Sequence, residues 1–333
     1  MASYLMLRSP SANRTYAGEA AKLSAAELEL TAPFASEIGP VRLAGVDYLS
    51  FTAEPDALDL ARVASQSSAW ALFERQGGLL APVELPSVDA FDDDLVTIPK
   101  YQGKTNEQFT RLLLNVTLSA VQRPADGPRQ ILDPMCGRGT TLTTAWLAGH
   151  DAYGVEPDDK ALEAMGAFLK TWLKRKKLKH TAAFTPVRRD GKVIGRRFDA
   201  EAGPGRAARH LTVFTGDARN SAALYGKKKF DAIVTDAPYG IVHGSHSDVR
   251  GVTGKRDRSP AGLLQSSIPV WAGQLKQSGA IGVSWNTFGL SREDLASYFT
   301  DAGLTVCEGG PWEQFSHRVD SSIKRDLMVA VRA

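Results

Sequence analysis

The chain of 333 residues has little cysteine and no long apolar run. Its two cysteines, Cys136 and Cys307, are too few for a disulfide framework and show no metal-ligand spacing, so neither a disulfide scaffold nor a metal centre is expected. A membrane-spanning helix needs about 20 consecutive apolar residues, and no such stretch is present. Residues 1–8 have neither a basic lead nor a long apolar core, so we expect no secretory signal. These absences favour a protein of the reducing cytoplasm.

Charge is distributed unevenly along the chain. Residues 1–98 contain 6 Lys and Arg against 14 Asp and Glu, a net charge of −8, whereas residues 99–333 contain 34 against 23, a net charge of +11. The hydrophobic content of 43% is ordinary for a soluble globular protein, and the length favours two domains. We therefore expect the C-terminal part, and not the N-terminal part, to meet a polyanion.

Residues 1–95 have the pattern of a small α+β domain. The predicted order of strands and helices is typical of a ferredoxin-like fold: strands at 4–7, 41–51 and 69–73, helices at 19–30 and 56–64. Residues 96–124 predict the end of an acidic linker, followed by an amphipathic helix that begins after Thr105 or Asn106.

Residues 125–333 alternate regularly between strand and helix patterns. Such alternation predicts a doubly wound α/β fold with a parallel sheet. The predicted strands are at 130–132, 152–155, 211–214, 230–235 and 280–285, with helices at 140–147, 158–178, 260–277 and 292–302 between or beside them. Residues 305–308 and 326–332 predict a closing antiparallel pair.

A glycine-containing turn, residues 133–140 (DPMCGRGT), follows the first of these strands. Gly137 and Gly139 allow the backbone to approach a ligand closely, and the amides at the start of the next helix favour a carboxylate. The pattern is neither the dinucleotide-binding nor the P-loop motif. A tight turn without a ligand is the alternative. Cys136 within it is expected to pack as a small apolar residue and not to act as a nucleophile.

Four acids end successive predicted strands: Asp133, Glu156, Asp217 and Asp236. In this position Glu156 can accept hydrogen bonds from both hydroxyls of a ribose. Asp217 can accept one from an adenine amino group, although a helix N-cap is its alternative role. The series favours S-adenosylmethionine over NAD as the cofactor.

The segment 236–239 (DAPY) is the most specific element. An amine on a heteroaromatic ring is a poor nucleophile because its lone pair is delocalised. The Asp236 carboxylate and the Ala237 carbonyl can accept its two N–H bonds and so align that lone pair for attack. Pro238 fixes the turn and Tyr239 offers a ring on which a base can stack. A Pro-Tyr-Gly turn without chemistry is the alternative.

Together these motifs resemble those of amino-methyltransferases. DAPY is similar to Asp/Asn-Pro-Pro-Tyr, and the turn 133–140 resembles that of the tRNA guanine-N2 methyltransferases, the Trm-eleven and archaeal guanosine-ten enzymes. The resemblance covers residues 100–333, although Ala237 replaces a proline and residues 1–95 show no THUMP pattern. It implies the class I methyltransferase fold with a C-terminal antiparallel hairpin, S-adenosyl-L-methionine, and methylation of guanine N2 in tRNA. The implied cofactor-binding residues are Thr105, Asn106, Asp133, Pro134, Cys136, Gly137, Gly139, Thr140, Glu156, Asp217, Ala218 and Asp236.

A basic insertion, residues 174–209, lengthens the connection between the second and third strands of this domain. It carries 12 Lys and Arg against 3 acids, and residues 187–193 predict a hairpin with an Asp-Gly turn. We expect it to contact phosphates, with a solvated insertion as the alternative. The predicted RNA-binding residues are Lys174, Arg175, Lys176, Lys177, Arg188, Arg189, Arg196 and Arg197. The glycine-rich stretch 243–262 is a candidate substrate lid.

Two other functions fit the motifs less well. A DNA adenine or cytosine amino-methyltransferase would share DAPY, but the insertion and the lid are small for a target-recognition region. A non-catalytic RNA-binding module on the same fold would need neither Asp236 nor Tyr239.

Overall fold

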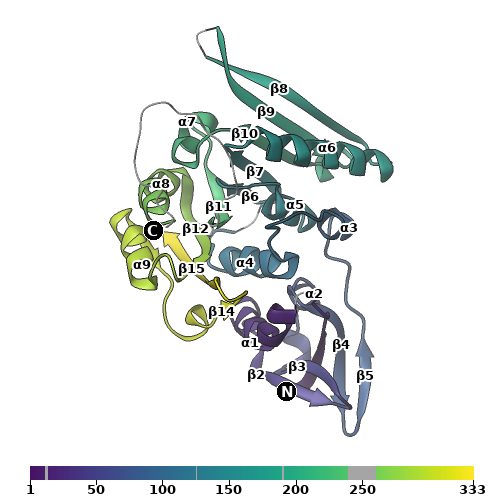
Figure 1. The fold of residues 1–333 in the computed structure, drawn as a ribbon. Coiled ribbons are helices and arrows are strands. Elements are labelled where there is room, and N and C mark those ends of the chain that lie inside the picture. Colours follow the sequence, from purple (N-terminus) through teal and green to yellow (C-terminus); the bar gives the residue numbers. More distant parts are fainter. Residues whose placement is uncertain (12–13, 125, 190, 239–259) are drawn as a thin grey trace.

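The computed structural model describes residues 1–11, 14–124, 126–189, 191–238 and 260–333. Two sheets organise the chain, a five-stranded antiparallel sheet near the N-terminus and a larger mixed sheet in the remainder (Figure 1). Within the described ranges, no helix combines the length and apolar character needed to span a membrane.

The N-terminal unit, residues 1–83, has the strand order β2-β3-β1-β4-β5. Helix α1 packs against one face of this sheet, where the core contains Met6, Leu28, Leu49 and Phe51. The order is that of a ferredoxin-like βαββαβ unit with β5 added at one edge. Its elements are β1 (Ala2–Arg8), α1 (Arg14–Thr31), β2 (Ser36–Leu43), β3 (Val46–Ala53), α2 (Leu60–Ala64), β4 (Ala69–Gln76) and β5 (Leu79–Val83).

The larger sheet has the order β13-β15-β12-β11-β6-β7-β10-β9-β8. Strands β6, β7, β10, β11 and β12 are parallel, and β15 is antiparallel to both β12 and β13. This is the predicted class I methyltransferase sheet with its antiparallel closing strands, so the predicted fold class is confirmed. The strands are β6 (Gln130–Asp133), β7 (Asp151–Glu156), β8 (His180–Arg189), β9 (Lys192–Ala202), β10 (Arg209–Thr215), β11 (Phe230–Asp236), β12 (Leu275–Asn286), β13 (Leu304–Val306), β14 (His317–Arg318) and β15 (Lys324–Arg332).

Helices cover both faces of this sheet, so its central strands are buried on both sides and are largely apolar. Phe109 and Leu113 of α4 belong to the core on one face, and Trp271 of α8 and Phe299 of α9 to the core on the other. The helices are α3 (Asp94–Thr97), α4 (Glu107–Ser119), α5 (Thr140–Leu147), α6 (Asp159–Arg175), α7 (Ser221–Tyr225), α8 (Ala261–Gln274) and α9 (Arg292–Asp301).

The N-terminal unit packs against this sheet's helices through α1. Tyr16, Leu23 and Ala26 of α1 belong to the same buried cluster as Phe109 and Leu113 of α4. In Figure 1, α1 accordingly lies between the small sheet and α4. The two parts of the chain therefore share a core.

Residues 84–106 form a strap between the two sheets rather than a free acidic linker. The amide of Ala90 donates to the carbonyl of Leu147 at 2.8 Å, and the indole of Trp172 donates to Asp94 at 2.8 Å. Lys176 forms ion pairs of 2.7 Å with both Asp92 and Asp94. The acids that made this segment look like a solvated linker are thus partners of α6.

Strands β8 and β9 form a long antiparallel ribbon that extends the sheet beyond β10 (Figure 1). The hairpin predicted over residues 187–193 is therefore the outer end of a much longer pair. The sheet has a carboxyl edge, where the parallel strands end, and an amino edge, where they begin.

Candidate active site

The crevice of this sheet lies where β6 sits between β11 and β7. The chain order of the strands reverses there, and open α/β sheets bind ligands outside the carboxyl ends of strands at such a point. Asp133 ends β6 and Asp236 ends β11, so the two carboxylates meet at the reversal. A cavity of about 430 Å³ lies beside them, within the usual range for small-molecule sites. Of the predicted residues, its lining contains Thr105, Asp133, Cys136, Gly137, Thr140, Asp236, Ala237 and Pro238.

The glycine turn forms one wall of the cavity. Gly137 and Gly139 have φ angles of 52° and 85°, in the left-handed region that favours glycine. A Cβ on Gly139 would lie 2.5 Å from the Met165 sulfur, so the turn and α6 also need its absence for close packing. Because α5 begins at Thr140, its free amides open toward the cavity, an arrangement that favours a carboxylate.

Glu156 ends β7 as predicted, and Asp217 lies two residues beyond the end of β10, but neither lines the cavity. Glu156 is 9% exposed and accepts hydrogen bonds from the amides of Gly137 and Asp158, at 2.8 and 2.9 Å. Burial raises the pKa of Glu156. Its contact with Gly137 fixes the glycine turn.

Asp217 has the N-cap role that was its alternative in the sequence. It caps the short 3-10 helix Ala218–Asn220 by accepting from the Arg219 amide at 2.8 Å, and it also accepts from the Arg219 guanidinium. That guanidinium holds the pKa of Asp217 below its usual range. Four other predicted cofactor-binding residues are likewise outside the cavity lining: Asn106, Pro134, Gly139 and Ala218. Contact of all these residues with a cofactor stays a prediction.

Asp236 is held from three directions by residues far apart in the sequence. Thr105 donates its hydroxyl to Oδ2 at 2.6 Å, and Ser284 of β12 donates to Oδ1. Arg325 of β15 places Nη2 3.6 Å from Oδ2. The amide of Ala237 donates to the Ser284 carbonyl at 2.8 Å, which fixes the chain immediately after Asp236. Tyr239 of the predicted motif, and most of the candidate lid, lie outside the described residues.

Asp133 occupies the equivalent end of β6 in different surroundings. Only 2% of it is exposed, and it accepts hydrogen bonds from the Thr235 hydroxyl at 2.7 Å and the Met135 amide at 3.0 Å. Burial, with a smaller contribution from the nearby charge of Asp236, raises its pKa to about 7. The protonated form of Asp133 is therefore present near neutral pH.

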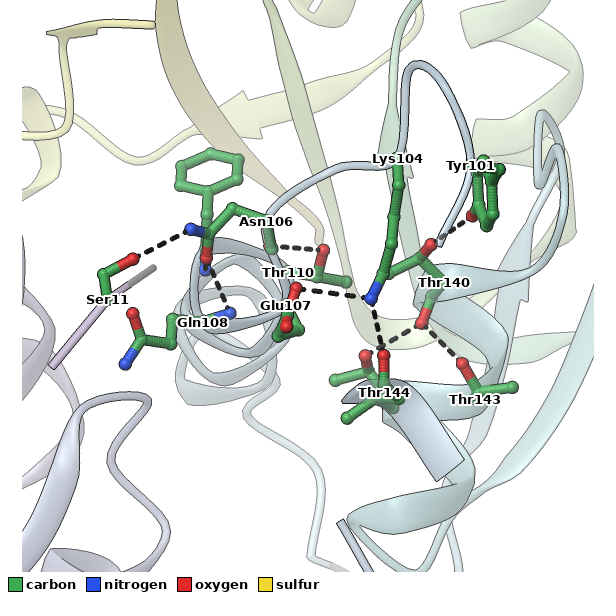
Figure 2. A network of polar contacts seen from close by, with 12 residues as sticks. Ser11, Tyr101, Lys104, Asn106, Glu107, Gln108, Thr110, Thr140, Thr143 and Thr144 are labelled. Atoms are coloured by element: carbon green, nitrogen blue, oxygen red, sulfur yellow. Dashed lines mark hydrogen bonds and ion pairs between the residues drawn. The ribbon is translucent and has the colours of Figure 1, made fainter. Parts of the chain in front are cut away.

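The last part of the strap forms a further wall (Figure 2). The Tyr101 hydroxyl is 2.6 Å from the Thr140 hydroxyl at the start of α5, and the Arg138 guanidinium lies 5.0 Å from the centre of the Tyr101 ring. Asn106 caps α4 by accepting from the amides of Gln108 and Phe109. The strap thus joins the starts of α4 and α5, although only Thr105 and Asn106 in it were predicted to matter.

Sequence reasoning missed Arg325, Ser284 and Tyr101. Arg325 and Tyr101 line the cavity, and Ser284 bonds to Asp236. None belongs to a motif, because each reaches the site from an element distant in the chain. The one available signal was Arg325 itself, one of three charged residues that precede the apolar run of β15.

Cys136 lines the cavity but is 6% exposed, and burial raises the pKa of its thiol well above the usual value. A thiol kept protonated in this way packs against its neighbours and is a poor nucleophile. In the described part of the chain, no group of three or more His, Cys, Asp or Glu side chains is arranged to hold a metal ion.

The predicted RNA-binding residues do not form one surface. His180, the first residue of β8, is level with Ala202 of β9 and with Arg209, the first residue of β10, and so lies at the amino edge. The residues shortly before it, Lys174, Arg175, Lys176 and Lys177, therefore lie near that edge and away from the cavity. Lys176 is also paired with Asp92 and Asp94. The predicted RNA-binding residues are therefore divided between two clusters, because α6 runs from the carboxyl edge to the amino edge. Contact of either cluster with RNA stays a prediction.

The other half of the basic segment is at the carboxyl edge. Arg197 is level with Phe214 near the end of β10, and residues 188–193 extend beyond that level. Arg196 and Arg197 are engaged with Glu163 and Asp199. Arg188 and Lys192 are exposed near the outer end of the ribbon, beside Val193 and Ile194, which are 55% and 54% exposed.

Residues 116–256 match a family described as RMKL-like, methyltransferase domain. The chain carries a methyltransferase domain. The match covers less than half of the chain and includes the glycine turn, the four strand-end acids and the DAPY segment. Comparison with curated protein sequences finds no match.

Several solved structures resemble the chain at low identity. TrmN from Thermus thermophilus is 15% identical over 76% of this chain and 56% of its own, with a TM-score of 0.41. The rRNA methyltransferase aviRa from Streptomyces viridochromogenes is 17% identical over 73% and 91%, with a TM-score of 0.39. Magnesium protoporphyrin IX methyltransferase from Synechocystis PCC 6803, solved with bound SAM, is 14% identical over 70% and 87%, with a TM-score of 0.41. At these TM-scores the fold assignment rests on the strand order of the methyltransferase domain.

Proposed function

We propose that the methyltransferase domain uses S-adenosyl-L-methionine to methylate an exocyclic amine of a base in RNA, with guanine N2 in tRNA as the specific target. The observation that carries this proposal is the placement of Asp236. Its carboxylate stands at the strand-order reversal, beside a glycine turn and on the wall of a cavity large enough for a small molecule. A simple binding module has no need for a carboxylate fixed by three separate elements.

The residues of the cavity fit this cofactor. Two glycines with positive φ leave the turn without side chains, and the start of α5 offers amides to a carboxylate. The cofactor, when bound, supplies an electrophilic methyl group. The turn 133–140, which includes Thr140, would hold the amino-acid end of the cofactor. Glu156 and Asp217 are the candidates for binding its ribose and its adenine, and Asp217 must release Arg219 to do so.

In the reaction, Asp236 and the Ala237 carbonyl accept the two N–H bonds of the base amine. This orients the nitrogen lone pair toward the methyl group, and the carboxylate stabilises the positive charge that develops on the nitrogen. Asp236 then takes the proton that the methylated amine releases. Asp133, with its pKa raised to about 7, carries less negative charge beside it near neutral pH than an ordinary Asp would.

RNA as the substrate is supported by the resemblance of the turn 133–140 to that of tRNA guanine-N2 methyltransferases and by the ribbon. Residues 185–197 carry five Lys and Arg against one Asp, and the ribbon extends past the carboxyl edge, where the base must enter. Cations in that position can contact the phosphates that flank a target nucleotide.

The proposal is tested by incubating the protein with methyl-labelled cofactor and unmodified tRNA, rRNA or duplex DNA. We expect label in tRNA, recovered as N2-methylguanosine after nucleoside digestion. Label that enters only DNA, recovered as a methylated adenine or cytosine, would contradict the RNA assignment. Cofactor and RNA binding without transfer to any nucleic acid would favour the binding-module alternative.

A further inference from the structure

Arg325 is an unusual residue for a cavity wall because it is a nearly buried charge. Its side chain is 5% exposed, and its Nη2 atom lies 3.6 Å from Oδ2 of Asp236, whose side chain is 13% exposed. Removal of one partner of a buried ion pair is strongly destabilising, since the other charge is left uncompensated. The two residues therefore constrain each other.

The guanidinium is also fixed by the groups beneath it. It lies over the Phe109 ring of α4, 4.5 Å from the ring centre, and Phe109 is completely buried. His317 of β14 is the cross-strand neighbour of Arg325, and its ring centre is 5.1 Å from that of Phe109. Burial lowers the pKa of His317 to about 4, so at neutral pH the imidazole carries no charge that would repel Arg325.

The N-terminal unit completes this arrangement. Tyr16 of α1 is buried and meets the edge of the His317 ring, with 6.0 Å between ring centres and an interplanar angle of 83°. A continuous series of ring contacts thus connects α1, through His317 and Phe109, to the guanidinium that faces Asp236.

We propose that Arg325 is a positioning residue for Asp236, and that α1 of the N-terminal unit supports it through Tyr16, His317 and Phe109. The role in transfer rests on the proposed function, because it concerns the carboxylate that receives the base amine. Thr105, Ser284 and Arg325 hold this carboxylate from the strap, β12 and β15, so its rotation is restricted. Orientation of this kind matters because a displacement of about 1 Å can lower a rate by about 10²-fold.

The first test compares Arg325→Ala, Arg325→Lys and the control Lys324→Ala, an exposed cation on the same strand. Arg325→Ala is expected to lower kcat for RNA methylation by about 10²-fold, with KM for RNA and Kd for the cofactor within about twofold of wild type. Guanidinium ions added to the solution should restore part of that rate. Arg325→Lys keeps the charge but loses the planar guanidinium that lies over Phe109, so an intermediate kcat is expected. Lys324→Ala should behave as wild type.

The inference is overturned if a folded Arg325→Ala variant keeps kcat within about threefold of wild type. It is equally overturned if kcat and cofactor affinity fall by the same factor and guanidinium restores neither. Should Arg325→Ala fail to fold, as judged by its melting curve, the Arg325→Lys comparison decides by the same two criteria.

A second test examines the contribution of α1. Tyr16→Phe keeps the ring and Tyr16→Leu removes it, whereas Glu29→Gln changes an exposed residue of the same helix as a control. Tyr16→Leu is expected to lower kcat by a clearly larger factor than Tyr16→Phe, without a change in cofactor Kd. Equal values of kcat in the two variants would remove α1 from the proposal.

Crystal structures separate this inference from the proposed function. In Arg325→Ala we expect the Asp236 carboxylate to rotate away from at least one of its bonds to Thr105 and Ser284. An unchanged carboxylate would overturn the positioning role even if the wild type methylates tRNA. A rotated carboxylate would support it even if the substrate is another nucleic acid.

Discussion

At the carboxyl edge of the large sheet, acids end the strands, whereas at the amino edge arginines meet the ends of helices. Asp133 and Asp236 at the first edge border a cavity of about 430 Å³. A hollow of about 340 Å³ at the second edge is lined by Arg62, Arg111 and Arg129, together with other residues. If the number of positive charges alone decided, the arginine-rich hollow would be the stronger candidate for an anion site.

The contacts of these arginines show otherwise. Arg62 donates to the carbonyl of Thr31, the last residue of α1, at 3.0 Å, and Arg111 donates to the carbonyl of Ser65, which caps α2, at 3.3 Å. Such carbonyls carry the negative end of a helix dipole, which these cations offset. Arg111 is further paired with Asp89 at 2.6 Å. The comparison teaches that the position of a charge relative to strand and helix ends decides its use, and that charge count does not.

Among the changes that test this comparison of the two edges, Asp236→Asn should have the largest effect on activity. The amide keeps the shape of the side chain, but one acceptor oxygen becomes a donor that faces Thr105, Ser284 or Arg325. We expect methyl transfer to fall by at least about 10³-fold, with cofactor Kd, measured by calorimetry, nearly unchanged. Transfer within about tenfold of wild type would show that the carboxyl edge does not carry the chemistry.

Gly139→Ala should weaken the cofactor site at the same edge. The residue has φ 85°, and the new Cβ would lie 2.5 Å from the Met165 sulfur. We expect the free energy of unfolding to fall by about 1–3 kcal/mol and cofactor Kd to rise. The matched control is Gly226→Ala after α7, where φ is 60° but nothing lies within 4 Å of the new Cβ. It should lose stability without loss of cofactor affinity; equal effects on Kd would contradict a specific role for the turn.

The two basic clusters allow the edges to be compared directly in RNA binding. The double variant Arg188→Gln with Lys192→Gln removes exposed cations from the ribbon, and Lys174→Gln with Lys177→Gln removes two from the end of α6. The first pair should weaken binding and reduce the slope of log affinity against log salt by about 1–2, because fewer phosphates are neutralised. The second pair should leave the slope nearly unchanged. Fluorescence anisotropy over a KCl series measures both, and a larger effect of the α6 pair would reverse the assignment.

The smallest expected effect is on the pH dependence of stability. Burial raises the pKa of Asp133 from an ordinary 3.8 to about 7, so the folded state binds more protons than the unfolded state between these values. The contribution of Asp133 to the free energy of unfolding is therefore highest below about pH 4 and falls as pH rises toward 7. Asp133→Asn removes the titration and keeps an acceptor for Thr235. The free energy of unfolding, measured with urea, should fall less between pH 5 and pH 7.5 in Asp133→Asn than in wild type. An equal fall in the two proteins would assign the pH dependence to other buried acids.

The sequence predicted the parts of the fold that depend on local pattern. Apolar runs marked β6, β7, β10, β11 and β12, and the turn at Gly137 and Gly139 follows from glycine chemistry. The strand-end acids were placed correctly because parallel strands in alternating βα order end at one edge.

Features that depend on contacts distant in the chain could not be predicted. The attachment of the ribbon to the sheet depends on the pairing of β9 with β10, and the course of the strap depends on the ion pairs of Lys176 with Asp92 and Asp94. Arg325 reaches Asp236 from β15, and no local pattern joins two residues 89 positions apart. The roles of Glu156 and Asp217 show the same limit, since position at a strand end did not reveal their protein partners.

The place of β15 in the sheet has a consequence for folding. It is later in the chain than both β12 and β13, yet it lies between them. The sheet must therefore keep an unpaired edge on β12 until β15 enters, and pairing between segments so distant is slow to form. An unpaired edge of this kind is prone to join another chain. Because β15 also carries Arg325, a protein caught at this stage would expose an aggregation-prone strand and leave Asp236 without its cation.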